Sequence, residues 1–333
     1  MFGLAENLAL KSFVPMTDQT KRRRRSAQQA PRATRSVPYK NLRHPYTPQT
    51  IWSEDEVANV HDTALRVVEE LGIRILLDEA REMLVAAGAI ERGDMMIHIG
   101  RDMIAAALET APPSFLLRAP NPENNIVFEP GAMLFKAGSG CPNATDMERG
   151  RRPGSLRDFC ETLKLQQSYD VIHTLGPSAE PQDVPINLRH YATVNAQMEV
   201  SDKLSFIYSR GRGQVQQSFE MLQLANNLTQ DEFEGASWCT TVINSNSPRM
   251  LDKPMAQGII DFARVGQLAI ITPFCLAGAM APVTVAGALV LQHAEALAAI
   301  TLSQIAKPGA PVSYGGFSSN VDMKSGAPAF GTP

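Results

Sequence analysis

The chain has 333 residues, 44% of them hydrophobic and 20% charged, which is enough apolar content for a sizeable core and too much for a disordered chain. Four cysteines without a Cys-x-x-Cys pair exclude a disulfide-stapled secreted scaffold and the common structural zinc patterns. The net charge of −3 is unevenly spread, because residues 1–50 hold ten basic and two acidic residues and the remainder holds 21 basic and 32 acidic ones.

Residues 1–50 are expected to form a basic, disordered leader, because they show no apolar periodicity. The Lys/Arg run at 21–25 is of a kind that can contact nucleic acid or anionic lipid. The acidic remainder of the chain argues against a nucleic-acid partner. The start lacks the basic and apolar segments of a signal peptide, so we expect a cytoplasmic protein.

Residues 51–130 predict a small section of helices and short strands. A capping box at 53–56, with serine first and glutamate three residues later, opens a helix that Gly72 ends. The expected elements are helices at 53–71, 78–87 and 101–110 and strands at 115–118 and 125–128.

Residues 131–333 alternate short apolar runs with helical patterns. The expected strands lie at 133–137, 171–175, 204–208, 238–243, 269–277 and 312–316, and the expected helices at 155–168, 187–200, 215–227, 251–265 and 283–306. Strands that alternate with helices indicate βα units and a parallel sheet. Each unit takes about 35 residues, close to the spacing in a barrel of eight units and about 250 residues.

The number of strands leaves two architectures open. A six-stranded open barrel would have two unpaired edges, which proteins normally cover. The chain is therefore expected to be either an open, doubly wound sheet or a barrel that lacks its last units.

One apolar stretch has the length of a membrane span. Residues 267–294 contain no charged side chain, and a bilayer is crossed by about 20 helical residues. Pro273 and Pro282 would break a single helix there. We expect a buried strand, a loop and a buried helix, and no membrane partner.

Five separated segments carry a recognisable pattern. They lie at 53–73, 155–158, 292–298, 307–312 and 326–333. In this order they resemble the trimethylamine methyltransferase family, from about residue 50 to the C-terminus. The resemblance implies an α/β fold of the (β/α)8 TIM-barrel type. The barrel is expected to be incomplete in this chain, with about six βα strands at 131–333, because family members continue past Pro333.

The resemblance also implies an enzyme that moves a methyl group from a small methylated amine to the cobalt of a corrinoid. That corrinoid is carried by a partner protein, so no cofactor is expected to bind this chain directly, and a homo-oligomer is expected. A quaternary amine such as a betaine is favoured over trimethylamine. When a quaternary amine loses one methyl group, the leaving group is an uncharged tertiary amine, so no acid has to protonate it. The position of pyrrolysine in archaeal members lies beyond this sequence. The alternative is an inactive remnant or a binding protein of the same fold.

A methylated cation is held best by aromatic faces and nearby carboxylates, which in a barrel lie at the C-terminal ends of the strands. The candidates for substrate binding are His173, Asn244, Phe274, Glu295, Tyr314 and Asp322. His173 could instead pack in the core, Glu295 could form a structural ion pair or hydrogen bond, and Asp322 could cap a turn. No catalytic residue and no metal ligand is assigned.

Two glycine-containing loops are weaker candidates. The loop at 138–142 suits a close backbone approach. The basic loop at 210–213 could hold an anion such as a substrate carboxylate, although a solvated loop is the favoured interpretation.

Overall fold

The computed structural model describes residues 42–176 and 178–331, so the run at 21–25 and most of the expected leader lie outside it. The helices are α1 (Glu54–Arg66), α2 (Asp78–Ala86), α3 (Arg101–Thr110), α4 (Leu156–Gln167), α5 (Arg189–Val200), α6 (Arg212–Ala225), α7 (Gln230–Glu234), α8 (Lys253–Arg264) and α9 (Val285–Ala306). The strands are β1 (Ile73–Ile75), β2 (Ile90–Arg92), β3 (Met96–His98), β4 (Phe115–Leu117), β5 (Ile126–Phe128), β6 (Asn143–Asp146), β7 (Gly150–Pro153), β8 (Ser205–Phe206), β9 (Cys239–Ile243), β10 (Met250–Leu251), β11 (Leu268–Ile271), β12 (Phe274–Ala277), β13 (Val312–Tyr314), β14 (Phe317–Val321) and β15 (Pro328–Ala329).

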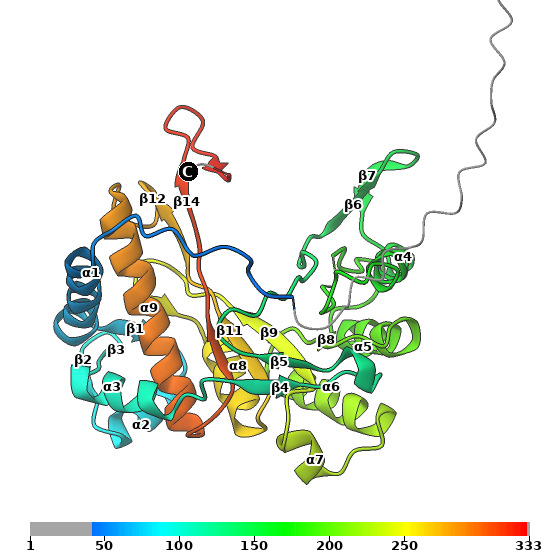
Figure 1. Ribbon diagram of the computed structural model, residues 1–333, viewed down its shortest axis with the longest axis horizontal. Helices are drawn as coiled ribbons and strands as arrows, with labels where there is room; N and C mark the ends of the chain where they lie inside the picture. The colour runs from blue at the N-terminus through cyan, green and yellow to red at the C-terminus, as the bar shows by residue number, and fades with distance from the viewer. Residues whose placement is uncertain (1–41, 177, 332–333) are drawn as a thin grey trace, which may run out of the picture. The chain divides into compact units, whose positions relative to one another are not determined.

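The centre of the fold is a wall of parallel strands in sequence order. Strands β8, β9, β11 and β13 pair in that order (Figure 1). Single parallel bridges extend the wall from Leu204 to Thr174 and from Thr174 to Lys136. A doubly wound sheet reverses its strand order at a switch point, so the sequential order excludes that alternative. Among the described residues the wall is open and does not close into a barrel.

The two faces of the wall have different surroundings, because successive side chains of a strand point to opposite faces. Ile243 and Ile271 lie in the main hydrophobic core together with Ile259 and Ile260 of α8. We call the opposite face the inner face. It carries the side chains of Thr240, Ile270 and Ser313 and adjoins a cavity described below.

Helix α9 is long and apolar enough to cross a bilayer, yet most of it is buried within the protein. It packs against α1, α3 and α8 (Figure 1). Its N-cap is Thr284, whose hydroxyl accepts a hydrogen bond from the Gly287 N–H at 3.2 Å. The predicted strand at 269–277 divides at Pro273 into β11 and β12. The structure thus has the expected buried strand and a mostly buried helix, with one extra break at Pro273.

The N-terminal helices surround a small sheet with the order β10-β1-β3-β2. Helix α1 has the predicted capping box, in which Glu56 accepts from the Ser53 N–H at 2.8 Å. A π-helical turn, Val67–Leu71, follows it and ends at Gly72, whose φ of 71° favours glycine. Strand β10 comes from the loop after β9 and pairs in parallel with β1, which the local sequence pattern did not indicate.

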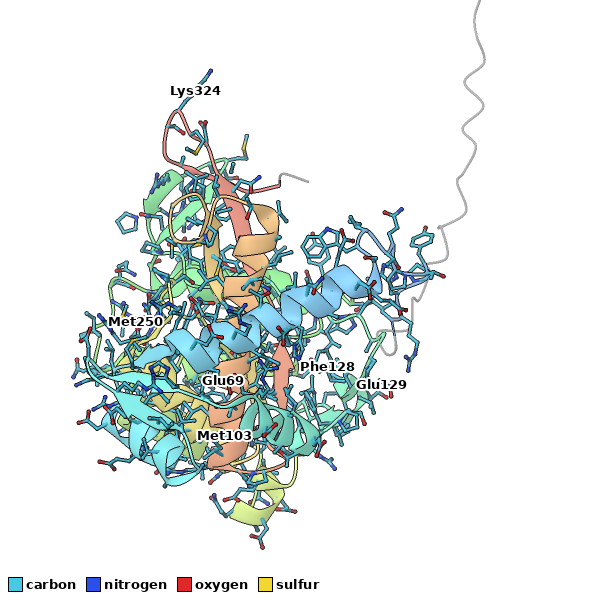
Figure 2. The ribbon with its side chains drawn as sticks, turned by 90° about the vertical axis from the view of Figure 1, so that its left-hand side faces the viewer. Glu69, Met103, Phe128, Glu129, Met250 and Lys324 are labelled. Atoms are coloured by element: carbon cyan, nitrogen blue, oxygen red, sulfur yellow. The ribbon has the colours of Figure 1, made fainter. Side chains whose placement is uncertain are left out.

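Residues 317–321, which follow the sixth predicted strand at 312–316, form strand β14. β14 pairs in parallel with β12, and the chain then turns back into β15. Lys324 projects from the tip of that turn (Figure 2). At the other end of the described chain, residues 42–44 pair with residues 131–133, so the last part of the predicted leader is ordered against the protein.

The burial of α9 leads to a stability prediction. Leu302 on α9 is fully buried, and its replacement by alanine leaves a cavity, so we expect Leu302→Ala to lower the free energy of unfolding by about 2–5 kcal/mol. Leu224 on α6 is 84% exposed, and Leu224→Ala should change it by less than about 0.5 kcal/mol. Urea titration followed by circular dichroism measures both. Equal losses would show that α9 does not anchor the core.

Candidate functional site

A cavity of about 350 Å³ adjoins the inner face. It is lined by Leu117, Phe128, Ala132, Met133, Leu134, Phe135, Lys136, Thr174, Thr240, Leu268, Ile270 and Ser313. The hairpin β4–β5 bounds it, because Leu117 and Ile126 pack with Leu204 and Leu268 in a separate small core. The volume lies in the range of small-molecule sites, about 300–1,000 Å³. The lining is mostly apolar, and of the described residues in it only Lys136 carries a charge.

Lys136 belongs to the first strand segment of the wall and is bridged to Thr174. Its Nζ lies 3.2 Å from the Ser139 hydroxyl and 3.4 Å from the Ala137 carbonyl oxygen. The same ammonium group lies 4.2 Å from the centre of the Phe206 ring, in a cation–π contact. Burial lowers the pKa of Lys136 to about 8, because removal from water disfavours the charged form.

A second ring and cation lie next to this pair. Tyr208 packs edge-on against Phe206 with 5.0 Å between ring centres, and the Arg210 guanidinium lies 4.1 Å over the Tyr208 ring. Arg210 forms an ion pair with Glu180, which also pairs with Arg189 at 3.1 Å. Burial raises the pKa of Tyr208 to about 12, so its phenol is neutral at pH 7. The wall thus presents two aromatic rings, each covered by a cation of the chain.

The basic loop at 210–213 is partly exposed, and its two arginines are paired with carboxylates. Arg210 is held by Glu180, and Arg212 is the first residue of α6. Arg212 pairs with Glu79 at 2.7 Å and with Asp261 at 2.9 Å. Both arginines are therefore engaged by carboxylates of the chain.

Glu295 is only 2% exposed and acts as an anchor for the loop between β9 and α8. One of its carboxylate oxygens accepts from the Ser247 hydroxyl at 2.7 Å and from the Ser245 hydroxyl. The other accepts from the Arg249 N–H at 2.7 Å. Burial raises the pKa of Glu295 above its ordinary value, although these hydrogen bonds lower it in part. No ion pair with Glu295 occurs in the part of the chain that the structure describes.

Tyr314 lies in a hydrogen-bonded series that crosses from α1 to β13. His61 and His293 share a hydrogen bond of 2.8 Å between Nδ1 and Nε2, and His293 Nδ1 lies 3.2 Å from the Tyr314 hydroxyl. The pKa of His293 is lowered by burial and by the nearby His61. Tyr314 pairs with Ile271 of the core, so it faces the helices and not the inner face.

The other four predicted residues occupy separate places. His173 is buried, and its Nδ1 accepts from the Phe135 N–H at 3.0 Å. Asn244 follows β9 and accepts from the Thr272 hydroxyl at 2.7 Å. Phe274 belongs to a stack of three rings with Phe317 and Phe330, at separations of 5.0 and 5.4 Å. Asp322 is exposed and accepts from the Lys324 N–H at 3.0 Å and the Ser325 hydroxyl at 2.6 Å in the turn before β15.

The structure places the six predicted residues on several elements and loops. The inner-face cavity, as the described residues define it, is lined by none of them. Glu295, Tyr314 and Phe274 come from α9 and from strands that pack on it, whereas Asp322 closes a tight turn. Sequence reasoning did not identify Lys136. The signal was present, because a lysine inside a predicted apolar strand at 133–137 is unusual.

The titration of Glu295 gives a test of its burial. Its pKa is raised in the folded state, so the folded protein loses stability as the pH rises above the ordinary value of 4.5 and the carboxyl ionises. Glu295→Gln keeps the shape and removes this loss. We expect the free energy of unfolding of the variant, relative to that of wild type, to increase as the pH rises above the ordinary pKa of 4.5.

Glu220→Gln on the exposed face of α6 is the matched control for the replacement of a helical glutamate by glutamine. Chemical denaturation at several pH values measures both variants. A difference between Glu295→Gln and wild type that stays constant with pH would contradict a buried, titrating Glu295.

Comparison with known proteins gives these features a context. The family model for trimethylamine methyltransferase matches residues 18–333. A glycine betaine methyltransferase of Desulfitobacterium hafniense (strain Y51) is 32% identical over 284 residues, which are 85% of this chain and 59% of the relative. A trimethylamine methyltransferase of D. hafniense (strain DSM 10664 / DCB-2) is 25% identical over 284 residues, 85% of this chain and 57% of the relative.

A proline betaine:corrinoid methyltransferase of Eubacterium limosum is 26% identical over 297 residues, 84% of this chain and 59% of the relative. The chain spans about three fifths of the length of these curated relatives. The family model covers nearly every residue, including the wall, the cavity and α9. The resemblance seen in the sequence is confirmed, and the chain belongs to the trimethylamine methyltransferase family.

Proposed function

We propose that the protein transfers a methyl group from a quaternary amine, a betaine in preference to trimethylamine, to the cobalt of a corrinoid held by a partner protein. Membership of the family supports methyl transfer from a methylated amine. Two of the relatives described above are named for betaines, and the name of one includes the corrinoid. Action in the cytoplasm and a homo-oligomeric state remain predictions.

The observation that carries the proposal is the ring of Phe206 on the parallel wall. It already holds an ammonium group, that of Lys136, at 4.2 Å. A quaternary ammonium group has no N–H to donate and is recognised by such faces. The cavity of about 350 Å³ that Lys136 lines has room for a small betaine.

We further propose that the wall is part of a (β/α)8 barrel. The sequential order of its parallel strands supports this arrangement. In such barrels the substrate is bound at the C-terminal ends of the strands. Tyr208, Arg210 and Asn244 follow the ends of β8 and β9 and lie at that end of the wall.

Methyl transfer from a quaternary amine to cobalt requires few chemical groups of the chain itself. The electron pair of the reduced cobalt forms a bond to the methyl carbon, and the carbon–nitrogen bond breaks with its pair left on nitrogen. A quaternary amine leaves as an uncharged tertiary amine, so no general acid is needed. The protein then has to hold the cation, expose one methyl group to the partner and exclude water.

The direct test is methyl transfer to reduced cobalamin from a panel of glycine betaine, proline betaine and trimethylamine, followed by the absorbance change of the cobalamin. We expect turnover with a betaine and less with trimethylamine. Absence of transfer from every member of the panel would refute the proposed activity. Binding of a betaine without transfer would favour the alternative of a binding protein.

The aromatic contact can be tested separately. Phe206→Leu removes the ring but keeps an apolar side chain, so we expect it to weaken binding of a quaternary amine by about 2- to 30-fold, the range of cation–π contacts. Phe330→Leu, at a ring that is 59% exposed and away from the cavity, is the matched control. Isothermal titration calorimetry measures the affinities, and thermal unfolding checks that both variants fold. Unchanged affinity in Phe206→Leu would remove Phe206 from the site.

A further inference from the structure

The electrostatic character of the inner-face cavity is unusual for a site that receives a cation. Among the described residues of its lining, the single charge is the positive charge of Lys136. A substrate that carries only positive charge would meet like charge there, at close range and in a medium of low dielectric constant. A substrate that also carries a carboxylate would meet opposite charge.

Lys136 is poorly satisfied by its own protein. An ammonium group has three N–H donors. Two oxygens, of Ser139 and Ala137, lie at the long distances of 3.2 and 3.4 Å, and the third neighbour is the face of Phe206. Within residues 42–176 and 178–331 no carboxylate forms an ion pair with it, and burial alone accounts for its lowered pKa.

The neighbouring cation behaves differently, which makes Lys136 distinctive. Arg210 also lies over an aromatic ring, but Glu180 neutralises it. Arg212 is neutralised by Glu79 and Asp261. The structure thus pairs Arg210 and Arg212 with carboxylates and leaves the lysine of the cavity to an external anion.

We propose that Lys136 binds the carboxylate of the substrate, so that the inner-face cavity selects methylated amines that carry an acid group over plain methylamines. This assignment rests on the proposed function. It gives Lys136 the role of a specificity-determining residue, because it contacts substrate without taking part in bond breaking. A charged hydrogen bond formed away from water is also among the stronger contacts that a small ligand can gain.

The test is calorimetric titration of the whole chain with two ligands of similar size, glycine betaine and tetramethylammonium. Wild type should bind glycine betaine at least about tenfold more tightly. Lys136→Met keeps the length of the side chain and removes its charge. It should weaken glycine betaine by about tenfold or more while tetramethylammonium binds as before or more tightly. Lys324→Met, at the exposed tip of the turn before β15 (Figure 2), is the matched control and should leave both affinities unchanged.

Lys136→Arg keeps the charge and should retain the preference for the carboxylate, which separates charge from packing if Lys136→Met is unstable. Equal binding of glycine betaine by wild type and Lys136→Met would overturn the role of Lys136 and leave the proposed function standing. If Lys136→Arg also loses the preference for glycine betaine over tetramethylammonium, the proposed role of Lys136 is overturned. No binding of either ligand by wild type, together with no methyl transfer, would overturn the proposed function itself.

Discussion

The arrangement of the molecule depends on one buried carboxylate. Glu295 lies on α9 and accepts hydrogen bonds from the loop that follows β9, at Ser247 and Arg249. That loop supplies β10 to the sheet of the N-terminal section, and the Arg249 guanidinium donates to the Leu71 carbonyl oxygen at 2.8 Å. Because α9 also packs on α1, α3 and α8, Glu295 lies at one of the contacts between the parallel wall and the N-terminal section.

The local elements were largely predictable, because their signals lie within a few residues of each other. The capping boxes at Ser53 and Ser155 form as expected, and the six strand segments of the wall occur in the predicted places. The pairing of β10 with β1 and of β14 with β12 was not predictable. These contacts join segments far apart in the sequence, and neither β10 nor β14 has a strong hydrophobic pattern of its own.

The site was harder to predict, because a shift of one residue in a strand moves a side chain to the opposite face. The sequence left open which face His173 occupies, and the structure buries it against the backbone of Phe135. Lys136 lies on the cavity side of the neighbouring segment, where periodicity alone gave no reason to look. Asp322 was hard to assign for a different reason. An aspartate can accept hydrogen bonds within a turn as well as bind a cation, and Asp322 does the former.

The hydrogen bond between His61 and His293 makes the contact of α1 with α9 sensitive to pH. One imidazole must donate and the other accept, so the bond survives only while at least one ring is neutral. Burial and His61 lower the pKa of His293, and the stability that this contact adds is complete above the ordinary value of 6.5 and declines as the pH falls below it. Protonation of His293 in mild acid would therefore weaken the contact between these two helices, because the added charge would lie in a partly buried junction.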